Sequence, residues 1–135
     1  MQLNDVHNSE QLQCLFDENK GWDKQYRLII QLGKLLTPMP EPLKLEEHKV
    51  KGCDSSAWLV ISERDGHYDF LMDSDTRVVK GLMKVVSLMF QGKTKQQIAL
   101  VDCEEVFSNL GLLHHLSPSR ANGIFAIIKK IQGVN

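Results

Sequence analysis

The sequence lacks an excess of charge of either sign. Its 135 residues carry 16 Lys and Arg against 17 Asp and Glu, which gives a formal net charge of −1 at pH 7. Proteins that hold nucleic acid or an anionic membrane through their overall charge are usually strongly basic. The composition therefore gives no reason to expect nucleic acid or a membrane as a partner.

Long hydrophobic runs are also missing. No uncharged apolar stretch approaches the roughly 18 residues that a membrane-spanning helix needs. The polar amino-terminal stretch MQLNDVHNSEQ does not have the charged-then-apolar layout of a secretory signal peptide. We therefore expect a cytoplasmic protein, and a length of 135 residues fits one domain that covers residues 1–135.

Cysteine is scarce, and the three cysteines are widely spaced at Cys14, Cys53 and Cys103. An odd number without a close pair does not predict a disulfide framework, and free thiols are the default in a reducing cytosol. The sequence has no zinc-type Cys and His spacing, no phosphate-binding loop and no GxGxxG motif. These absences leave open a metal site assembled from distant residues, or a cysteine paired with a distant histidine.

Amphipathic segments and one hairpin make up most of the chain. Apolar spacing and capping residues predict helices at residues 9–19, 22–36, 76–91, 96–99, 102–110 and 118–131. The apolar stripe of the second helix begins at Trp22, and that of the last helix is formed by its isoleucines. The expected caps at helix starts are Ser9, Ser74 or Asp75, Thr94, Asp102 and Ser117, and Gly111 is expected to end the fifth helix. Asp65-Gly66 predicts a two-residue hairpin turn between strands at residues 57–63 and 67–73. Residues 45–51 are expected to form a loop or a charged edge strand. The fold class is therefore α+β, with a small antiparallel sheet covered by helices.

Cys53 occupies an unusual place in the stretch VKGCDSSAW, between a charged segment and an apolar strand. Gly52 permits backbone shapes that other residues avoid. The basic side chains just before it would lower the pKa of the thiol, whereas Asp54 would raise it, so the net direction stays open. The alternative is a small buried apolar residue that happens to be cysteine.

Other residues have simpler interpretations. Cys14 lies between leucines of the first predicted helix and is expected to pack, and Cys103 is expected to be an incidental first-turn residue. Arg120 falls in the first turn of the last helix, where a cation is unfavourable, which favours a role in a salt bridge or at a partner. Gly81 and Gly123 lie within predicted helices, and close packing of another backbone would explain them.

Four stretches together resemble the SufE family of sulfur-acceptor proteins, which includes the CsdE proteins. They are WDKQYRLIIQLGKLLTPMP, GCDSSAW, DSDTRVVKGL and LSPSRANG, and they occur in the family's order and spacing. The resemblance extends from about residue 16 to residue 131. It implies helices packed on a three-stranded antiparallel sheet, with the third strand supplied near Lys49–Lys51.

The resemblance also implies a function. The chain would be an accessory protein rather than an enzyme, working with a pyridoxal-phosphate-dependent cysteine desulfurase and holding no cofactor itself. Cys53 would accept a persulfide sulfur and pass it to an iron–sulfur scaffold, while Gly52, Trp58 and Arg120 would support the loop or dock the partner. Two alternatives remain: a regulatory module that binds a desulfurase without covalent chemistry, and a metal or iron–sulfur scaffold that uses Cys53.

Overall fold

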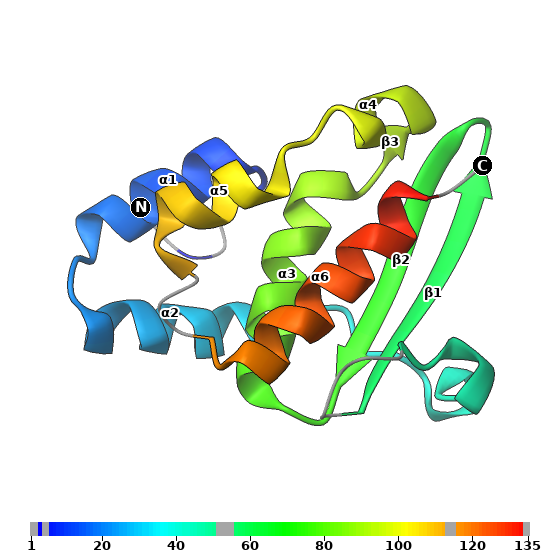
Figure 1. Ribbon diagram of the computed structural model, residues 1–135, viewed down its shortest axis with the longest axis horizontal. Helices are drawn as coiled ribbons and strands as arrows, with labels where there is room; N and C mark the ends of the chain where they lie inside the picture. Colours follow the sequence, from blue (N-terminus) through cyan, green and yellow to red (C-terminus); the bar gives the residue numbers. More distant parts are fainter. Residues whose placement is uncertain (1–2, 4–5, 51–55, 113–115, 134–135) are drawn as a thin grey trace.

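The computed structural model describes residues 3, 6–50, 56–112 and 116–133, and it has the expected α+β architecture (Figure 1). Its helices are α1 (Ser9–Glu18), α2 (Trp22–Lys34), α3 (Arg77–Phe90), α4 (Lys95–Ala99), α5 (Cys103–Leu110) and α6 (Pro118–Gln132). Its strands are β1 (Ala57–Arg64), β2 (His67–Ser74) and β3 (Lys93–Thr94), and two 3₁₀ turns, η2 (Glu41–Leu43) and η3 (Glu46–His48), precede β1. Within the described residues, none of the helices combines the length and the apolar character that crossing a membrane requires.

The sheet is antiparallel, with strand order β1-β2-β3. Asp65 and Gly66 have φ values of 53° and 81°, so the hairpin turn has the positive φ at both positions that was predicted. The third strand is Lys93–Thr94, which pairs with His67 and Tyr68 on β2. The prediction that residues near Lys49–Lys51 supply the third strand is therefore wrong for the described residues, and Lys51 lies outside them. The η3 turn holds the chain up to His48, and Lys49 makes only an isolated bridge to Trp58.

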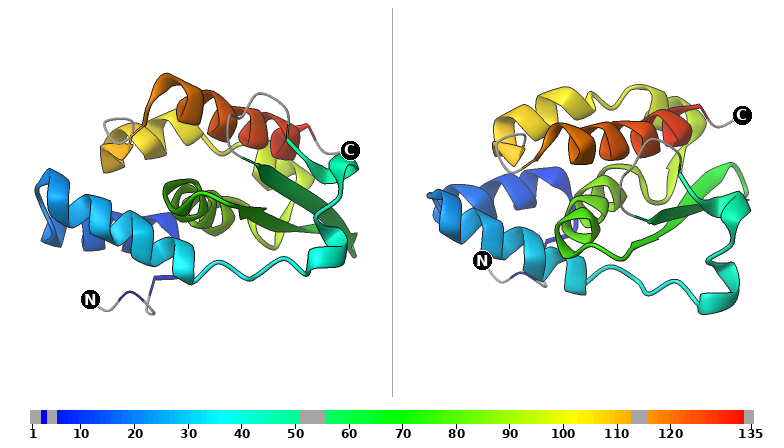
Figure 2. Two further views of the ribbon diagram at one scale, coloured as in Figure 1. Left: turned by 90° about the horizontal axis from the view of Figure 1, so that it is seen from below. Right: turned by 60° about the horizontal axis from the view of Figure 1, so that its bottom comes forward.

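Helices cover the sheet and one another in a simple order. Helix α2 packs on α3, α3 lies beside β2, and α6 runs in front of α3 (Figures 1 and 2). The face of β2 formed by Tyr68, Phe70 and Met72 is buried, as its alternation predicted. The predicted stripe of α6 is buried as well, at Ile124, Ile127, Ile128 and Ile131.

Several helix ends follow the predicted capping. Thr94 forms a capping box with Gln97, and the Asp102 and Ser117 side chains accept backbone N–H groups at the starts of α5 and α6. Gly111 ends α5 with a φ of 70°. These three helices therefore begin or end where short-range chemistry places them.

Two predicted caps are wrong. The N-cap of α1 is Asn8 rather than Ser9, because the Asn8 side chain accepts the Gln11 N–H at 2.8 Å. The N-cap of α3 is Thr76 rather than Ser74 or Asp75. Ser74 is instead the last residue of β2, and its hydroxyl donates to a backbone carbonyl next to β1.

Two residues expected in the core lie on the surface. Cys14 is exposed, on the side of α1 away from its buried leucines. Trp22 is 60% exposed and stacks on Tyr26 with ring centroids 5.3 Å apart. Trp22 is the first residue of α2, at the end of its apolar stripe, whereas Cys14 lies opposite the apolar stripe of α1.

Candidate functional site

The segment that contains Cys53 is closed at its base by backbone pairing. Cys53 and Gly52 lie outside the described residues, so the site is built from the residues on either side. The Val50 N–H donates to the Ala57 carbonyl at 2.9 Å, and both residues are buried. Val50 and Ala57, which lie on either side of the segment, are therefore direct neighbours in the fold.

The Ser56 carbonyl provides a second attachment. The Ser74 hydroxyl donates to it at 2.8 Å, and the Asp75 N–H donates to it at 3.3 Å. The Ser74 hydroxyl also accepts the Thr76 N–H at 3.2 Å. Ser74 thus joins the chain that follows Cys53 to the turn between β2 and α3.

Asp73 holds Ser74 in place from within the protein. Its carboxylate accepts the Ser74 N–H at 2.8 Å, and both residues are only 5% exposed. The ammonium groups of Lys44 and Lys80 each lie 3.5 Å from one of its carboxylate oxygens. A buried carboxylate requires such partners, and here they come from different elements, the segment after η2 and helix α3.

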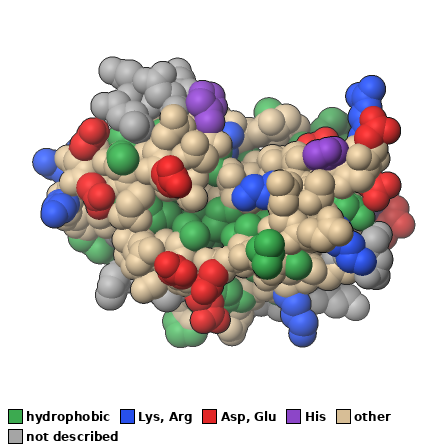
Figure 3. Space-filling view, turned by 90° about the horizontal axis from the view of Figure 1, so that it is seen from above, with side chains coloured by type: hydrophobic (Ala, Val, Ile, Leu, Met, Phe, Trp, Pro, Cys, Tyr) green, Lys and Arg blue, Asp and Glu red, His purple; other side chains and the backbone are tan. Residues whose placement is uncertain are grey.

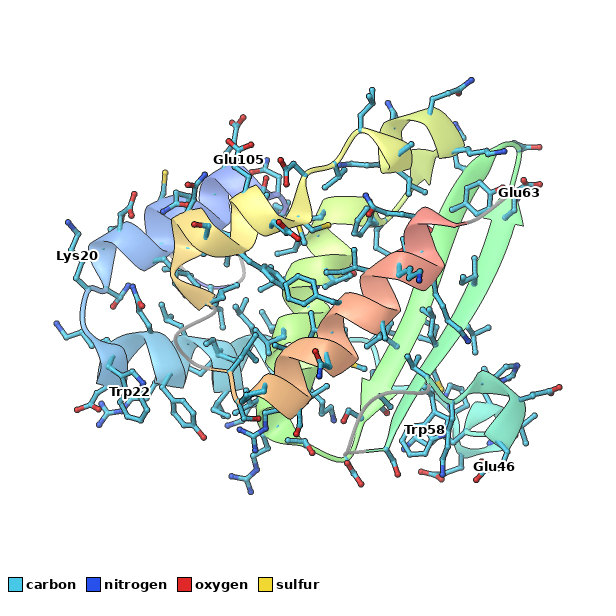
Figure 4. The ribbon with its side chains drawn as sticks, viewed as in Figure 1. Lys20, Trp22, Glu46, Trp58, Glu63 and Glu105 are labelled. Carbon is cyan, nitrogen blue, oxygen red and sulfur yellow. The ribbon has the colours of Figure 1, made fainter. Side chains whose placement is uncertain are left out.

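Trp58 lies beside this group, opposite Asp73 in the β1–β2 register. The Lys44 ammonium is 5.5 Å from the centre of the indole ring, a cation–π distance. The hydrogen bond from Lys44 to Glu41 is the main reason that the pKa of Lys44 lies above its ordinary value. The Trp58 Nε1 atom is buried and has no hydrogen-bond partner among the described residues. Figure 4 shows Trp58 and Glu46 at the same corner of the molecule.

The basic residues before Cys53 are largely engaged with their neighbours. The Lys49 ammonium lies 3.0 Å from the Glu46 carboxylate. The His48 Nδ1 atom is hydrogen-bonded to the Leu43 carbonyl at 2.8 Å. These two basic side chains therefore have partners of their own, and Lys51 lies outside the described residues.

Arg120 is half-buried in the first turn of α6, where its backbone N–H donates to the Ser117 hydroxyl at 3.3 Å. Across the described ranges, no hydrogen bond or ion pair joins its side chain to Trp58 or Asp73. Arg120 therefore stays a predicted docking residue that these contacts do not connect to the base of the Cys53 segment.

The other two cysteines differ sharply from each other. Cys14 is exposed on α1, whereas Cys103 is buried at the start of α5. Burial, reinforced by the Asp102 charge, raises the pKa of Cys103 from 9.0 to about 11. Cys103 is therefore a first-turn residue, as expected, whose thiol is buried and resists ionisation.

Two grooves lie on different sides of α6. A groove of about 570 Å³ beside the Cys53 segment is lined by Glu46, Glu47, Lys49, Val50, Ala126 and Lys130. A larger groove of about 740 Å³ separates α6 from the α4–α5 connection, where Leu100 is 84% exposed. Figure 3 shows hydrophobic side chains in a hollow on the upper face, with acidic side chains at its edge. Of these two grooves, the smaller one adjoins the predicted site.

Metal ligands do not converge in the part of the chain that the structure describes, where no three His, Cys, Asp or Glu side chains form a cluster. Sequence patterns missed the network of Lys44, Asp73, Ser74 and Lys80. The DSD stretch predicted only a helix cap, at Ser74 or Asp75. A polar pair at the end of a strand that precedes the helix was the only available signal.

Comparison with known proteins identifies the family. The family described as "SufE: Fe-S metabolism associated domain" matches residues 10–134. The chain belongs to the SufE family. An uncharacterized SufE-like protein of Rhizobium meliloti (strain 1021) is 39% identical over 115 residues, which cover 82% of this chain and 82% of the relative. This SufE-family chain therefore has a role in iron–sulfur metabolism.

The fold also matches a solved structure. A hypothetical protein from Thermus thermophilus, determined in solution, superimposes with a TM-score of 0.73 over 92% of this chain and 90% of that chain. The two sequences are 17% identical, so this likeness shows a shared fold alone. The α+β arrangement of this SufE-family protein is therefore found outside its near relatives in sequence.

Proposed function

We propose that this SufE-family protein is a sulfur carrier that accepts a persulfide sulfur on Cys53 from a cysteine desulfurase. The observation that carries the proposal is the place of Cys53, in a short segment whose ends meet at the Val50–Ala57 hydrogen bond. A transferable thiol must reach a partner while its chain stays attached to the fold. The family's role in iron–sulfur metabolism supplies the context for such a transfer.

The chemistry is an exchange between a thiolate and a persulfide. The Cys53 thiolate attacks the outer sulfur of the desulfurase persulfide, and a new S–S bond forms to Cys53 Sγ. The S–S bond in the desulfurase breaks, and its electron pair leaves on the desulfurase cysteine as a thiolate. The proton on the outer sulfur moves with that sulfur, so nothing is oxidised or reduced overall.

The other cysteines are less suited to this step. Cys103 is buried with a pKa raised to about 11, so it has very little thiolate near neutral pH. Cys14 is exposed, but it lies within the regular backbone of α1 and outside the motifs of the family resemblance. The carrier needs no cofactor of its own, because the desulfurase holds the pyridoxal phosphate. An iron–sulfur scaffold is the proposed recipient of the sulfur.

Desulfurase turnover, measured as alanine formed from cysteine, tests this proposal. The wild-type protein should increase turnover, and Cys53→Ser should lose the increase while Cys14→Ser keeps it. If Cys53→Ser stimulates as well as wild type, the protein is a non-covalent regulatory module. If the purified protein holds stoichiometric iron that Cys53→Ser loses, it is a scaffold rather than a carrier.

A further inference from the structure

We infer that Ser74 is a positioning residue for sulfur transfer, acting through the Ser56 carbonyl, and that Asp73 supports it. This inference rests on the proposed function of Cys53. Its basis is the 2.8 Å hydrogen bond from the Ser74 hydroxyl to Ser56, the first described residue after the segment that holds Cys53.

The hydrogen bond from the Ser74 hydroxyl to the Ser56 carbonyl has a defined geometry. Ser74 is buried, and its hydroxyl serves twice, as donor to Ser56 and as acceptor for the Thr76 N–H. Its backbone N–H is held by Asp73 at 2.8 Å. A hydroxyl with both roles filled has a defined orientation, so it constrains the direction in which the chain leaves Ser56.

The support of Asp73 extends across three parts of the fold. Lys44 precedes β1, Asp73 lies at the end of β2, and Lys80 lies in α3, and both ammonium groups are 3.5 Å from the carboxylate. The cluster therefore joins the base of the Cys53 segment to the helix layer. A partner that docks on this corner meets a base whose geometry is set before docking, which reduces the ordering that transfer requires.

Comparing the rate of persulfide transfer to Cys53 with its rate of alkylation distinguishes a positioning role from an effect on thiol reactivity. Persulfide transfer needs Cys53 aligned with a sulfur held by another protein, whereas iodoacetamide can approach a thiol from many directions. A positioning role therefore predicts that losing the Ser74 hydroxyl slows transfer and leaves alkylation of Cys53 unchanged. A role in thiolate formation predicts that both rates fall together.

The experiment measures the rate at which Cys53 gains sulfur from a persulfide-loaded cysteine desulfurase, by intact mass. Ser74→Ala should lower the rate about two- to tenfold, the range that one hydrogen bond contributes. Ser74→Thr keeps a hydroxyl and should restore most of the rate. Ser87→Ala is the matched control, because Ser87 is 7% exposed in α3 and lies outside this network.

Alkylation of all three cysteines, resolved by peptide mass, gives the second readout. In Ser74→Ala, Cys53 should react at the wild-type rate and Cys103 should stay slow. Asp73→Asn removes both ion pairs and should slow transfer while Cys53 is alkylated at the wild-type rate. Faster alkylation of Cys103 in Ser74→Ala would show that Ser74 serves folding, and would overturn the inference.

The inference and the proposed function can fail separately. If the wild-type protein gains no sulfur on Cys53, the proposed function fails. If the wild type gains sulfur and both variants match its rate, only the positioning role is overturned. A parallel fall in transfer and in Cys53 alkylation would also overturn it, since the effect would then lie in thiol reactivity.

Discussion

Gly81 of α3 lies directly against the backbone of Ile29 in α2. A β-carbon at Gly81 would overlap the Ile29 carbonyl oxygen. Across the same contact, a β-carbon at Gly33 would lie 2.9 Å from the Gly81 nitrogen. The two glycines let the helix backbones approach closely, and they fix how α2 seats on α3, the helix that also carries Lys80.

Alanine at Gly81 should therefore destabilise the protein. Alanine favours a helix over glycine by about 1 kcal/mol. Overlap with backbone atoms costs about 1–3 kcal/mol or more and outweighs that gain. Gly81→Ala should lower the free energy of unfolding in urea more than Gly33→Ala, whose nearest contacts are longer. Equal stability of Gly81→Ala and wild type would contradict this packing.

Replacing Asp73 should reveal a coupled cluster. Asp73→Asn should lower the free energy of unfolding by about 1–3 kcal/mol, because two ammonium groups lose their buried partner. Lys44→Met and Lys80→Met should each lower it less than Asp73→Asn does, since both lysine side chains are partly exposed and each variant leaves the other lysine beside Asp73. Urea titrations of single and double variants test the coupling, and strict additivity would count against it.

The Trp58 ring should contribute more to the stability of the fold than its N–H group does. The buried Nε1 atom has no partner among the described residues, so Trp58→Phe removes an unsatisfied donor while keeping an aromatic face beneath Lys44. Trp58→Phe should change the free energy of unfolding by less than about 1 kcal/mol. Trp58→Ala should lower it by about 2–4 kcal/mol. Equal losses in the two variants would show that the N–H group is bonded.

Stability should fall at alkaline pH because of Cys103. Its folded-state pKa is raised from 9.0 to about 11, so between these values the folded protein keeps a proton that the unfolded chain has lost. The stabilisation that the protonated Cys103 thiol gives the folded protein is therefore complete below the pKa of the unfolded state. It is lost as pH rises through the pKa of the folded state. The difference in unfolding free energy between wild type and Cys103→Ala should shrink across this interval. A constant difference would contradict the raised pKa.

Local chemistry explains why much of the fold was predictable. The Asp65-Gly66 turn, the capping box at Thr94 and the isoleucine stripe of α6 each depend on residues a few positions apart. The third strand was not predictable in this way. Lys93–Thr94 is two residues long and pairs through tertiary contact with β2, so it carries no alternation of its own.

The residues of the candidate site also differ in how far the sequence could predict them. Cys53 was recognised as a candidate because its motif is contiguous, and its role stays a prediction, as do those of Gly52, Trp58 and Arg120. The Asp73 network was missed because its members are brought together by folding. Lys44 is 29 positions from Asp73 in the sequence, and no local pattern around Lys44 indicates that its ammonium group lies beside a buried carboxylate.

Intact mass after incubation with a cysteine desulfurase and cysteine tests the central claim most directly. The wild-type protein and Cys14→Ser should each gain the mass of one sulfur atom, and a thiol reductant should remove it. Cys53→Ser should gain none. A Cys53→Ser protein that takes up sulfur as fully as the wild type would contradict the assignment of Cys53 as the acceptor.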